Sequence, residues 1–248
     1  MTSTNLVRSE IRKLTTTRMP LGFVAVLLLL AVLNGVAVAV GTDFDGSKTF
    51  ISTAADQQSL VAFAANALMI TGLFGAIAAA REYTHNTVIA TYLAAPRRPE
   101  ALRAQLVAVG LGGAVLGLIG ASLTIAALAV SLPLTDYGFL VTASGVTQVL
   151  LASTFAGAAG AVLGAGIGTV VRNTGGAVTG AVLALVIAPP LIIQLASGTA
   201  TWVPNALANV VSGVSDETNV AAAGAAMALW ALVPALIALL VVRRRDIV

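Results

Sequence analysis

Residues 21–40 read LGFVAVLLLLAVLNGVAVAV, a run that contains no charged side chain. The hydrocarbon of a bilayer is about 30 Å thick, and a helix needs roughly 20 consecutive apolar residues to cross it. Because unpaired backbone N–H and C=O groups are not tolerated in lipid, such a run is either a helix or part of a closed barrel. Barrel strands alternate apolar and polar residues, and this run does not. It predicts a transmembrane helix.

Five further runs along the chain have the same character. Of the 248 residues, 58% are hydrophobic and 9% are charged, whereas globular proteins average about 45–50% and about 25%. The sequence therefore predicts an all-α polytopic membrane protein in which residues 1–248 form a single transmembrane domain. The six expected spans are residues 21–40, 60–80, 106–132, 146–171, 177–196 and 220–242.

The placement of charge predicts the orientation of the chain. If both termini are cytoplasmic, the 13 Lys and Arg residues all fall in inner segments except Lys48. Inner segments of membrane proteins carry an excess of Lys and Arg, so both termini are expected in the cytoplasm. The same distribution explains the net charge of +3 without a nucleic-acid partner. The inner basic residues are Arg8, Arg12, Lys13, Arg18, Arg81, Arg97, Arg98, Arg103, Arg172, Arg243, Arg244 and Arg245.

Residues 3–18 precede the first span and are mostly polar. Val7, Ile11 and Leu14 recur at helical spacing within them. An amphipathic helix with a basic polar face lies on the surface of an anionic bilayer. We therefore expect an amphipathic entry helix at the inner surface, with a frayed basic tail as the alternative.

Two of the connecting segments are long enough to form structure of their own. Residues 81–103 make the largest inner segment, and a short helix parallel to the membrane is expected there. Residues 198–219 contain Trp202, Pro204 and a half-apolar stretch. Because Trp favours the headgroup region, an outer interfacial helix is expected. Residues 41–59, by contrast, read as a short polar outer loop.

Small residues and prolines are organised within the expected spans. Rows of glycines four residues apart let membrane helices approach closely. Pro189 and Pro190 interrupt the fifth span, where proline removes hydrogen bonds; the interruption is either a kink or part of a transport path. The glycine rows are Gly113 with Gly117, Gly160 with Gly164 and Gly168, and Gly176 with Gly180.

Residues that carry catalysis or bind metals are scarce. The chain has one histidine, His85, and no cysteine, and it lacks the constellations of hydrolases and metalloproteases. The run Gly41–Thr49 approximates a phosphate-binding loop but has one residue too many before its Lys48. Charged residues, which mark ion pathways, are absent from the expected span interiors. We therefore expect neither an enzyme nor a cofactor or metal site in this chain.

A few uncharged polar residues remain inside the expected spans. Interhelical hydrogen bonds of such residues contribute about 0.6 kcal/mol on average, so they can either pack helices together or contact a transported molecule. Both readings stay open from sequence. The candidates for a substrate path are Asn34, Asn66, Thr71, Gln148 and Gln194.

The segment from Arg81 to Gln105 reads REYTHNTVIATYLAAPRRPEALRAQ. It resembles the loop after the second span in the permease subunits of type-2 ABC exporters. In that family a Glu, an aromatic or basic residue and a Gly-Thr pair open the loop, and a Pro-Arg-Arg or similar group precedes the third span. The family's frequent Arg and Gly are Thr84 and Asn86 here. The matching residues are Glu82, Tyr83, His85, Thr87, Pro96, Arg97 and Arg98.

The resemblance implies a division of labour between two kinds of subunit. Residues 81–103 would form a cytoplasmic coupling helix that contacts a separate ABC ATPase subunit, which binds ATP and Mg²⁺. Two permease copies and two ATPase domains would form the exporter, with the substrate path between the permease copies. The residues expected at the ATPase contact are Glu82, Tyr83, His85, Asn86, Thr87, Pro96, Arg97 and Arg98.

The Trp202-x-Pro204 segment and the terminal residues 243–246, Arg-Arg-Arg-Asp, extend the resemblance along the chain. A small apolar or amphipathic substrate is expected, because the spans are rich in Ala, Val, Gly and Leu. Abundant Ala, Val and Gly, with more Arg than Lys, are typical of a GC-rich bacterial genome, so the bacterial inner membrane is the expected location. A non-transporting membrane scaffold or immunity protein that binds a cytoplasmic partner is the alternative.

Overall fold

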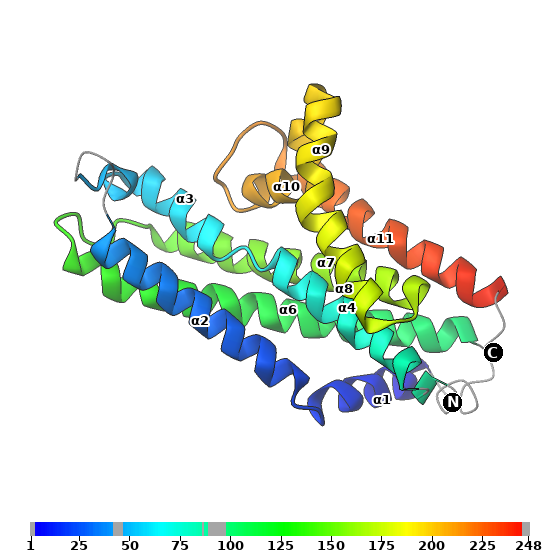
Figure 1. Ribbon diagram of the computed structural model, residues 1–248. Coiled ribbons are helices and arrows are strands. Elements are labelled where there is room, and N and C mark those ends of the chain that lie inside the picture. The colour runs from blue at the N-terminus through cyan, green and yellow to red at the C-terminus, as the bar shows by residue number, and fades with distance from the viewer. Residues whose placement is uncertain (1–2, 42–46, 86, 89–97, 245–248) are drawn as a thin grey trace.

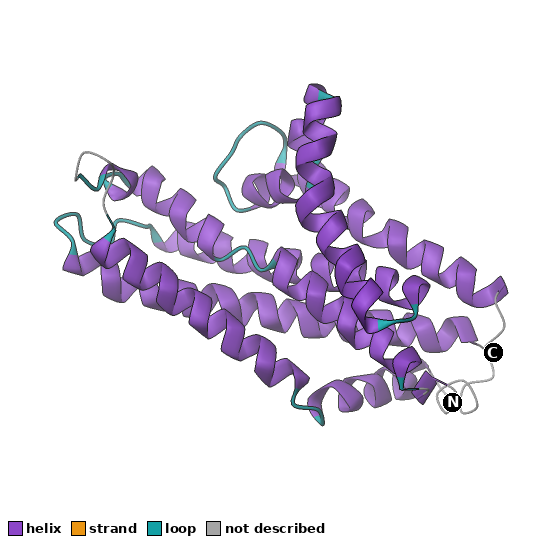
Figure 2. Cartoon of the chain, viewed as in Figure 1, coloured by secondary structure: helices purple, strands orange, loops and turns teal. Residues whose placement is uncertain are grey.

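The computed structural model describes residues 3–41, 47–85, 87–88 and 98–244. These residues form helices and turns, with no strand among them (Figure 2). Six helical stretches are long and apolar enough to cross a membrane. This confirms the predicted all-helical class and the number of spans, and it indicates a multi-pass membrane protein. The stretches are Met19–Val40, Ala54–Thr84, Arg98–Leu134, Ala143–Val171, Thr174–Leu195 and Val220–Arg244.

The longest helices run roughly side by side (Figure 1). Helix α7 (Ala143–Val171) is the central one, because it packs against α4 (Leu68–Thr84), α6 (Arg98–Ser131) and α11 (Val220–Arg244). Helix α2 (Met19–Val40) lies along α6. The short α1 (Ser3–Thr15) packs near the first turns of α6, where Leu6 meets Ala101 and Ala104.

Glycines on three sides of α7 allow these close approaches. A methyl group added at Gly164 would overlap the carbonyl oxygen of Gly72 on α4, and one added at Gly157 would overlap that of Gly113 on α6. Gly166 meets the backbone of α11 in the same way. The predicted rows through Gly113 and Gly164 are therefore confirmed as backbone packing surfaces.

The row Gly176 and Gly180 differs from the other two. A methyl group added there would meet the side chains of Val171 and Ile167, which belong to the end of α7 just before the turn into α8 (Thr174–Val182). These glycines let two consecutive helices fold back closely and do not bring together helices distant in the sequence.

The second span differs from the single helix predicted over residues 60–80. It begins at Ala54 and is divided into α3 (Ala54–Ala64) and α4. At the division the Asn66 side chain accepts a hydrogen bond from the backbone N–H of Leu68, at 3.2 Å. Asn side chains compete in this way with helical backbone bonds, so a run that is apolar on average still contains a break.

The fifth span accommodates its two prolines because the helix changes locally from α-helical to π-helical hydrogen bonding. Between α8 and α9 (Ala188–Leu195) the chain makes one π-helical turn, η3 (Leu183–Ile187), in which the Ala188 N–H donates to the Leu183 carbonyl. Pro189 and Pro190 then occupy the first turn of α9, where an intrahelical N–H partner is not required. The end of α9 stands away from the bundle in Figure 1.

The connection expected as a polar outer loop over residues 41–59 is partly helical and partly buried. Besides the first turns of α3, it contains the 3₁₀ turn η1 (Thr49–Ile51). Gln57 is fully buried; its amide donates to the carbonyls of Ile51 and Gly138 and accepts from the N–H of Leu140. One side chain thereby ties α3 to the segment between α6 and α7, which includes the 3₁₀ turn η2 (Leu132–Leu134).

The segment expected at residues 198–219 forms two short helices, η4 (Ser197–Trp202) and α10 (Pro204–Val211). The indole N–H of Trp230 on α11 donates to the Trp202 carbonyl at 2.9 Å. This bond fastens η4 to the last span.

Candidate functional site at the basic end

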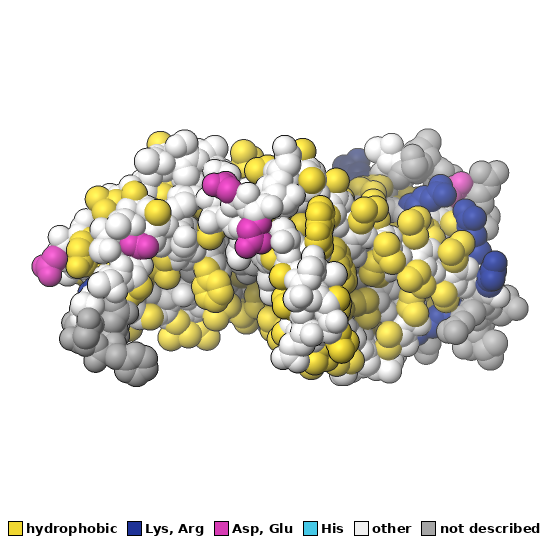
Figure 3. Space-filling model, turned by 90° about the horizontal axis from the view of Figure 1, so that it is seen from above, with side chains coloured by type: hydrophobic (Ala, Val, Ile, Leu, Met, Phe, Trp, Pro, Cys, Tyr) yellow, Lys and Arg dark blue, Asp and Glu magenta, His cyan; other side chains and the backbone are white. Residues whose placement is uncertain are grey.

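Charged side chains divide between the two ends of the molecule. In Figure 3 the Lys and Arg side chains gather at one end, and most of the acidic ones lie over the other half. We call the end with the Lys and Arg side chains the basic end. Both α1 and the last turn of α11 lie there (Figure 1). Its described basic residues are Arg8, Arg12, Lys13, Arg18, Arg81, Arg98, Arg103, Arg172, Arg243 and Arg244.

Lys48 is the basic residue that the sequence places apart from the others. Its ammonium group donates to the carbonyls of Val38 and Ala39, at 3.3 and 2.6 Å. These carbonyls belong to the last turn of α2, where the helix dipole is negative and a cation is stabilising. Lys48 therefore caps the C-terminal end of α2, in the acidic half of the molecule.

The last turn of α4 lies at the centre of the basic end. Successive residues of an α-helix point about 100° apart, so four residues at a helix end can face several neighbours. Arg81 reaches the sulfur of Met19 at the start of α2, at 3.7 Å. The next three residues contact α1 and the turn between α7 and α8, as described below. We call this set of contacts the α4 junction.

Glu82 contributes the contact with α1. Lys13 pairs with Glu82 at 3.1 Å and with Glu10, on its own helix, at 2.6 Å. Both carboxylates are largely buried, with side-chain exposures of 7% for Glu10 and 14% for Glu82. Because two buried anions share one cation, the position of α1 depends electrostatically on Lys13.

The environment shifts the pKa values of the α1 groups. Burial, and then the charge of Glu82, raises the pKa of Glu10, while Lys13 opposes that rise. Burial acts to lower the pKa of Lys13, but the Glu82 and Glu10 carboxylates raise it above its ordinary value. The stabilising contribution of Lys13 to the docking of α1 is therefore complete below the ordinary pKa of lysine. It is lost only as the pH rises through the raised pKa of Lys13.

Tyr83 and Thr84 contribute the contacts with the turn between α7 and α8. The Arg172 guanidinium lies over the Tyr83 ring, 5.4 Å from its centroid, within the range of a cation–π interaction. The hydroxyls of Thr84 and Thr174 lie 3.1 Å apart. Arg172 ends α7 with φ = 61°, a left-handed conformation that favours glycine. An arginine there adds the side chain that reaches Tyr83.

The residues predicted to contact an ATPase are placed unevenly around the α4 junction. Glu82 and Tyr83 face other parts of this chain, as described above. His85 is exposed directly after α4, Thr87 is exposed and donates to the Glu82 carbonyl at 3.3 Å, and Arg98 begins α6. Contact with a second protein stays a prediction for all of them. Asn86, Pro96 and Arg97 lie outside the described residues.

Four of the five polar residues suggested for a substrate path form hydrogen bonds with the backbone of this chain. Asn34 and Thr71 donate to carbonyls one turn earlier in their own helices. Asn66 caps the break before α4, Gln148 donates to the Val211 carbonyl at 3.4 Å, and Gln194 is exposed on α9. These contacts position helices and turns; a role in transport stays a prediction.

The sequence did not single out several residues that the structure makes important. Lys13 and Arg172 counted only toward the overall charge distribution, and Gln57 was read as part of a loop. Each of the three also has a partner 69 residues or more away along the chain, namely Glu82, Tyr83 and Gly138, and no local pattern identifies these distant pairs. Among the described residues, no group of three or more His, Asp or Glu side chains is placed to hold a metal ion.

No protein-family model matches the chain, and no curated protein matches it.

Proposed function

We propose that this chain is the membrane-spanning permease subunit of an ATP-driven ABC exporter, powered by a separate ATPase subunit. The motif residues around Glu82 and His85 suggest the family. The observation that carries the proposal is the α4 junction, where the residues just before the exposed His85 contact α1, α2 and the turn between α7 and α8. A movement of the segment after α4 would therefore be passed to α1, α2, α7 and α8.

The proposed mechanism follows from this connectivity. The basic end faces the cytoplasm of a bacterial cell, with both termini inside, in agreement with the positive-inside rule. The segment after α4 acts as the coupling element, and α1 is the interfacial entry helix. Closure of two ATPase subunits around ATP and Mg²⁺ moves the α4 junction, and the spans shift between two arrangements. Two permease copies enclose a path for a small apolar or amphipathic substrate.

Purification of the tagged chain from its native membranes tests this proposal. The expected result is a complex in which an ABC ATPase subunit accompanies the chain in equal amount and hydrolyses Mg²⁺-ATP. Vanadate, which traps ABC ATPases, should abolish the hydrolysis if the ABC ATPase subunit is its source. A partner without ATPase activity would instead favour the scaffold or immunity protein, and the exporter assignment would be withdrawn.

A further inference from the structure

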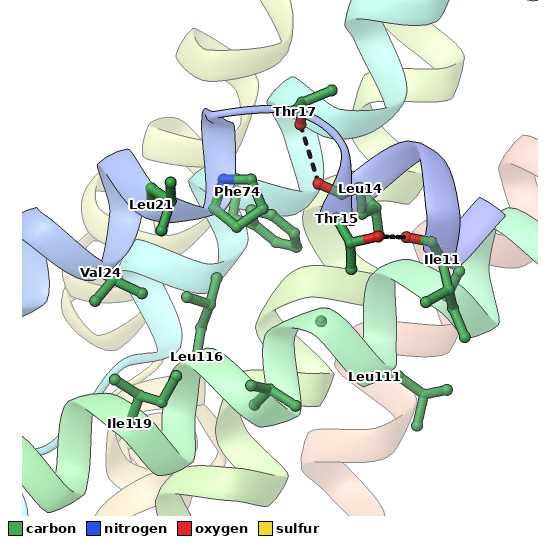
Figure 4. A pocket seen from close by; sticks show the side chains of 14 residues that line it. Ile11, Leu14, Thr15, Thr17, Leu21, Val24, Phe74, Leu111, Leu116 and Ile119 are labelled. Atoms are coloured by element: carbon green, nitrogen blue, oxygen red, sulfur yellow. Dashed lines mark hydrogen bonds between the residues drawn. The ribbon is translucent and has the colours of Figure 1, made fainter.

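A cavity of about 530 Å³ lies between α1, α2 and α6 at the basic end. Figure 4 shows how its walls are built, with Leu14 from α1, Leu21 from α2, and Leu111, Leu116 and Ile119 from α6. Phe74 of α4 also lines it and stands edge-on to Phe23, with ring centroids 5.5 Å apart. The volume is within the range of about 300–1,000 Å³ that is typical of small-molecule sites.

The wall offers little to a polar ligand. Its two hydroxyl groups already donate to backbone carbonyls of α1: Thr15 to Ile11 at 3.1 Å, and Thr17 to Leu14 at 3.0 Å (Figure 4). Burial of a polar group without partners costs free energy. The cavity therefore suits a hydrocarbon.

The cavity opens on the side of the bundle. Leu21 is 68% exposed, Leu111 52% and Val115 55%, and all three line it. These side chains belong to spans, so the opening faces the lipid of the bilayer.

Three arginines lie close in sequence to lining residues of the cavity at the basic end. Arg8 and Arg12 lie within one turn of Ile11 on α1, and Arg18 lies two residues before the lining residue Pro20. All three are exposed, and none forms an ion pair with a carboxylate of the described chain. Basic side chains next to a membrane attract anionic headgroups, each favouring an anionic over a neutral surface roughly five-fold.

We propose that this cavity binds one acyl chain of an anionic phospholipid from the leaflet at the basic end, with the phosphate held by Arg12 and Arg18. A transmembrane helix of a second copy is about 10 Å wide, so the cavity has room for little more than one helical turn of it. A single hydrocarbon chain fits the volume, the apolar wall and the sideways opening together. The site does not depend on an ATPase or on transport.

Photolabelling in vesicles tests this site. The full chain is reconstituted with phosphatidylglycerol or phosphatidylcholine that carries the same diazirine-bearing acyl chain, and labelled peptides are identified by mass spectrometry. Phosphatidylglycerol is expected to label residues 11–24 and 108–119 in preference to other exposed surfaces. Replacing both arginines, as Arg12→Gln with Arg18→Gln, is expected to lower this labelling roughly five- to 25-fold.

Two tryptophan variants separate the cavity from the general lipid surface. Val115→Trp fills the cavity and is expected to reduce labelling of α1 and α2, while Val130→Trp, on the same helix with 71% exposure and outside the cavity wall, leaves it unchanged. The arginine variants keep the test valid if the Val115 variant misfolds. Equal labelling by both lipids, or labelling spread evenly over α2 and α11, would each overturn the site.

Discussion

Gly164→Ala is expected to lower the stability of the chain markedly. The added methyl group would overlap the Gly72 carbonyl oxygen and would lie 2.8 Å from the backbone nitrogen of Ala76. Backbone atoms of α4 cannot move aside as a flexible side chain can, so α4 and α7 must separate. Overpacking of this kind costs up to about 3 kcal/mol and sometimes more; after the gain of up to about 1 kcal/mol from replacing glycine in a helix, a net loss of about 2 kcal/mol is expected.

The measurement is the thermal unfolding midpoint of the purified chain in detergent. With a net loss of about 2 kcal/mol, Gly164→Ala is expected to lower it by about 4–8 °C, from the general relation between free energy and midpoint. Gly224→Ala is the matched control, because a methyl group there meets nothing within 4 Å, and its midpoint should equal or exceed that of the wild type. Equal midpoints for the two variants would show that α4 and α7 do not approach as closely as described.

Lys13→Met is expected to release α1 from the bundle at neutral pH. The substitution leaves Glu10 and Glu82 close together without their shared cation. Removing one partner of a buried ion pair costs about 3–5 kcal/mol; because 41% of the Lys13 side chain is exposed, solvent screening reduces this to about 1–3 kcal/mol. The undocked fraction of α1 should rise roughly five- to 150-fold.

The absence of cysteine from the chain makes this release measurable. In a Leu6→Cys background, where residue 6 is 8% exposed, the rate of maleimide modification reports the undocked fraction. Lys13→Arg, which keeps the charge, and Arg243→Met, which removes an exposed cation of the basic end outside the cluster, serve as controls and should leave the rate near that of the background. Unchanged modification in Lys13→Met would show that this ion-pair cluster does not hold α1.

The variant should also acquire a pH dependence. Burial and the Glu82 charge raise the pKa of Glu10, and Lys13 is the group that opposes them; without it the pKa rises further. A carboxyl group whose pKa is raised in the docked state favours docking as the pH falls through that pKa. Acidification should therefore return α1 to its docked position in Lys13→Met. Glu82→Gln combined with Lys13→Met should restore docking without acid, because one of the two anions is gone.

The sequence was sufficient to predict the spans, because each depends on a local average of hydrophobicity. It also identified the close-packing glycines through Gly113 and Gly164, whose four-residue spacing is a helical signal. The break at Asn66 was missed because one polar residue barely changes such an average. The early start of α3 did have a local signal: Thr53 and Asp56 form a reciprocal capping box, a pattern that marks helix starts.

The α4 junction could not be predicted in the same way. The sequence placed Glu82 and Tyr83 at the start of an inner loop with a partner-binding role. The structure shows that their side chains contact Lys13 and Arg172. Such pairings are set by how the helices pack in three dimensions and not by a local sequence pattern.

A cytoplasmic ATPase can reach the segment after α4 only if the basic end lies in the cytoplasm. Labelling of single cysteines with a membrane-impermeant maleimide tests this directly, with His85→Cys at the exposed end of α4 and Tyr137→Cys between α6 and α7. In intact cells the cysteine at 137 should react and the one at 85 should not, and in inverted vesicles the pattern should reverse. Reaction of the cysteine at 85 in intact cells would contradict the orientation and, with it, the proposed contact with a cytoplasmic ATPase.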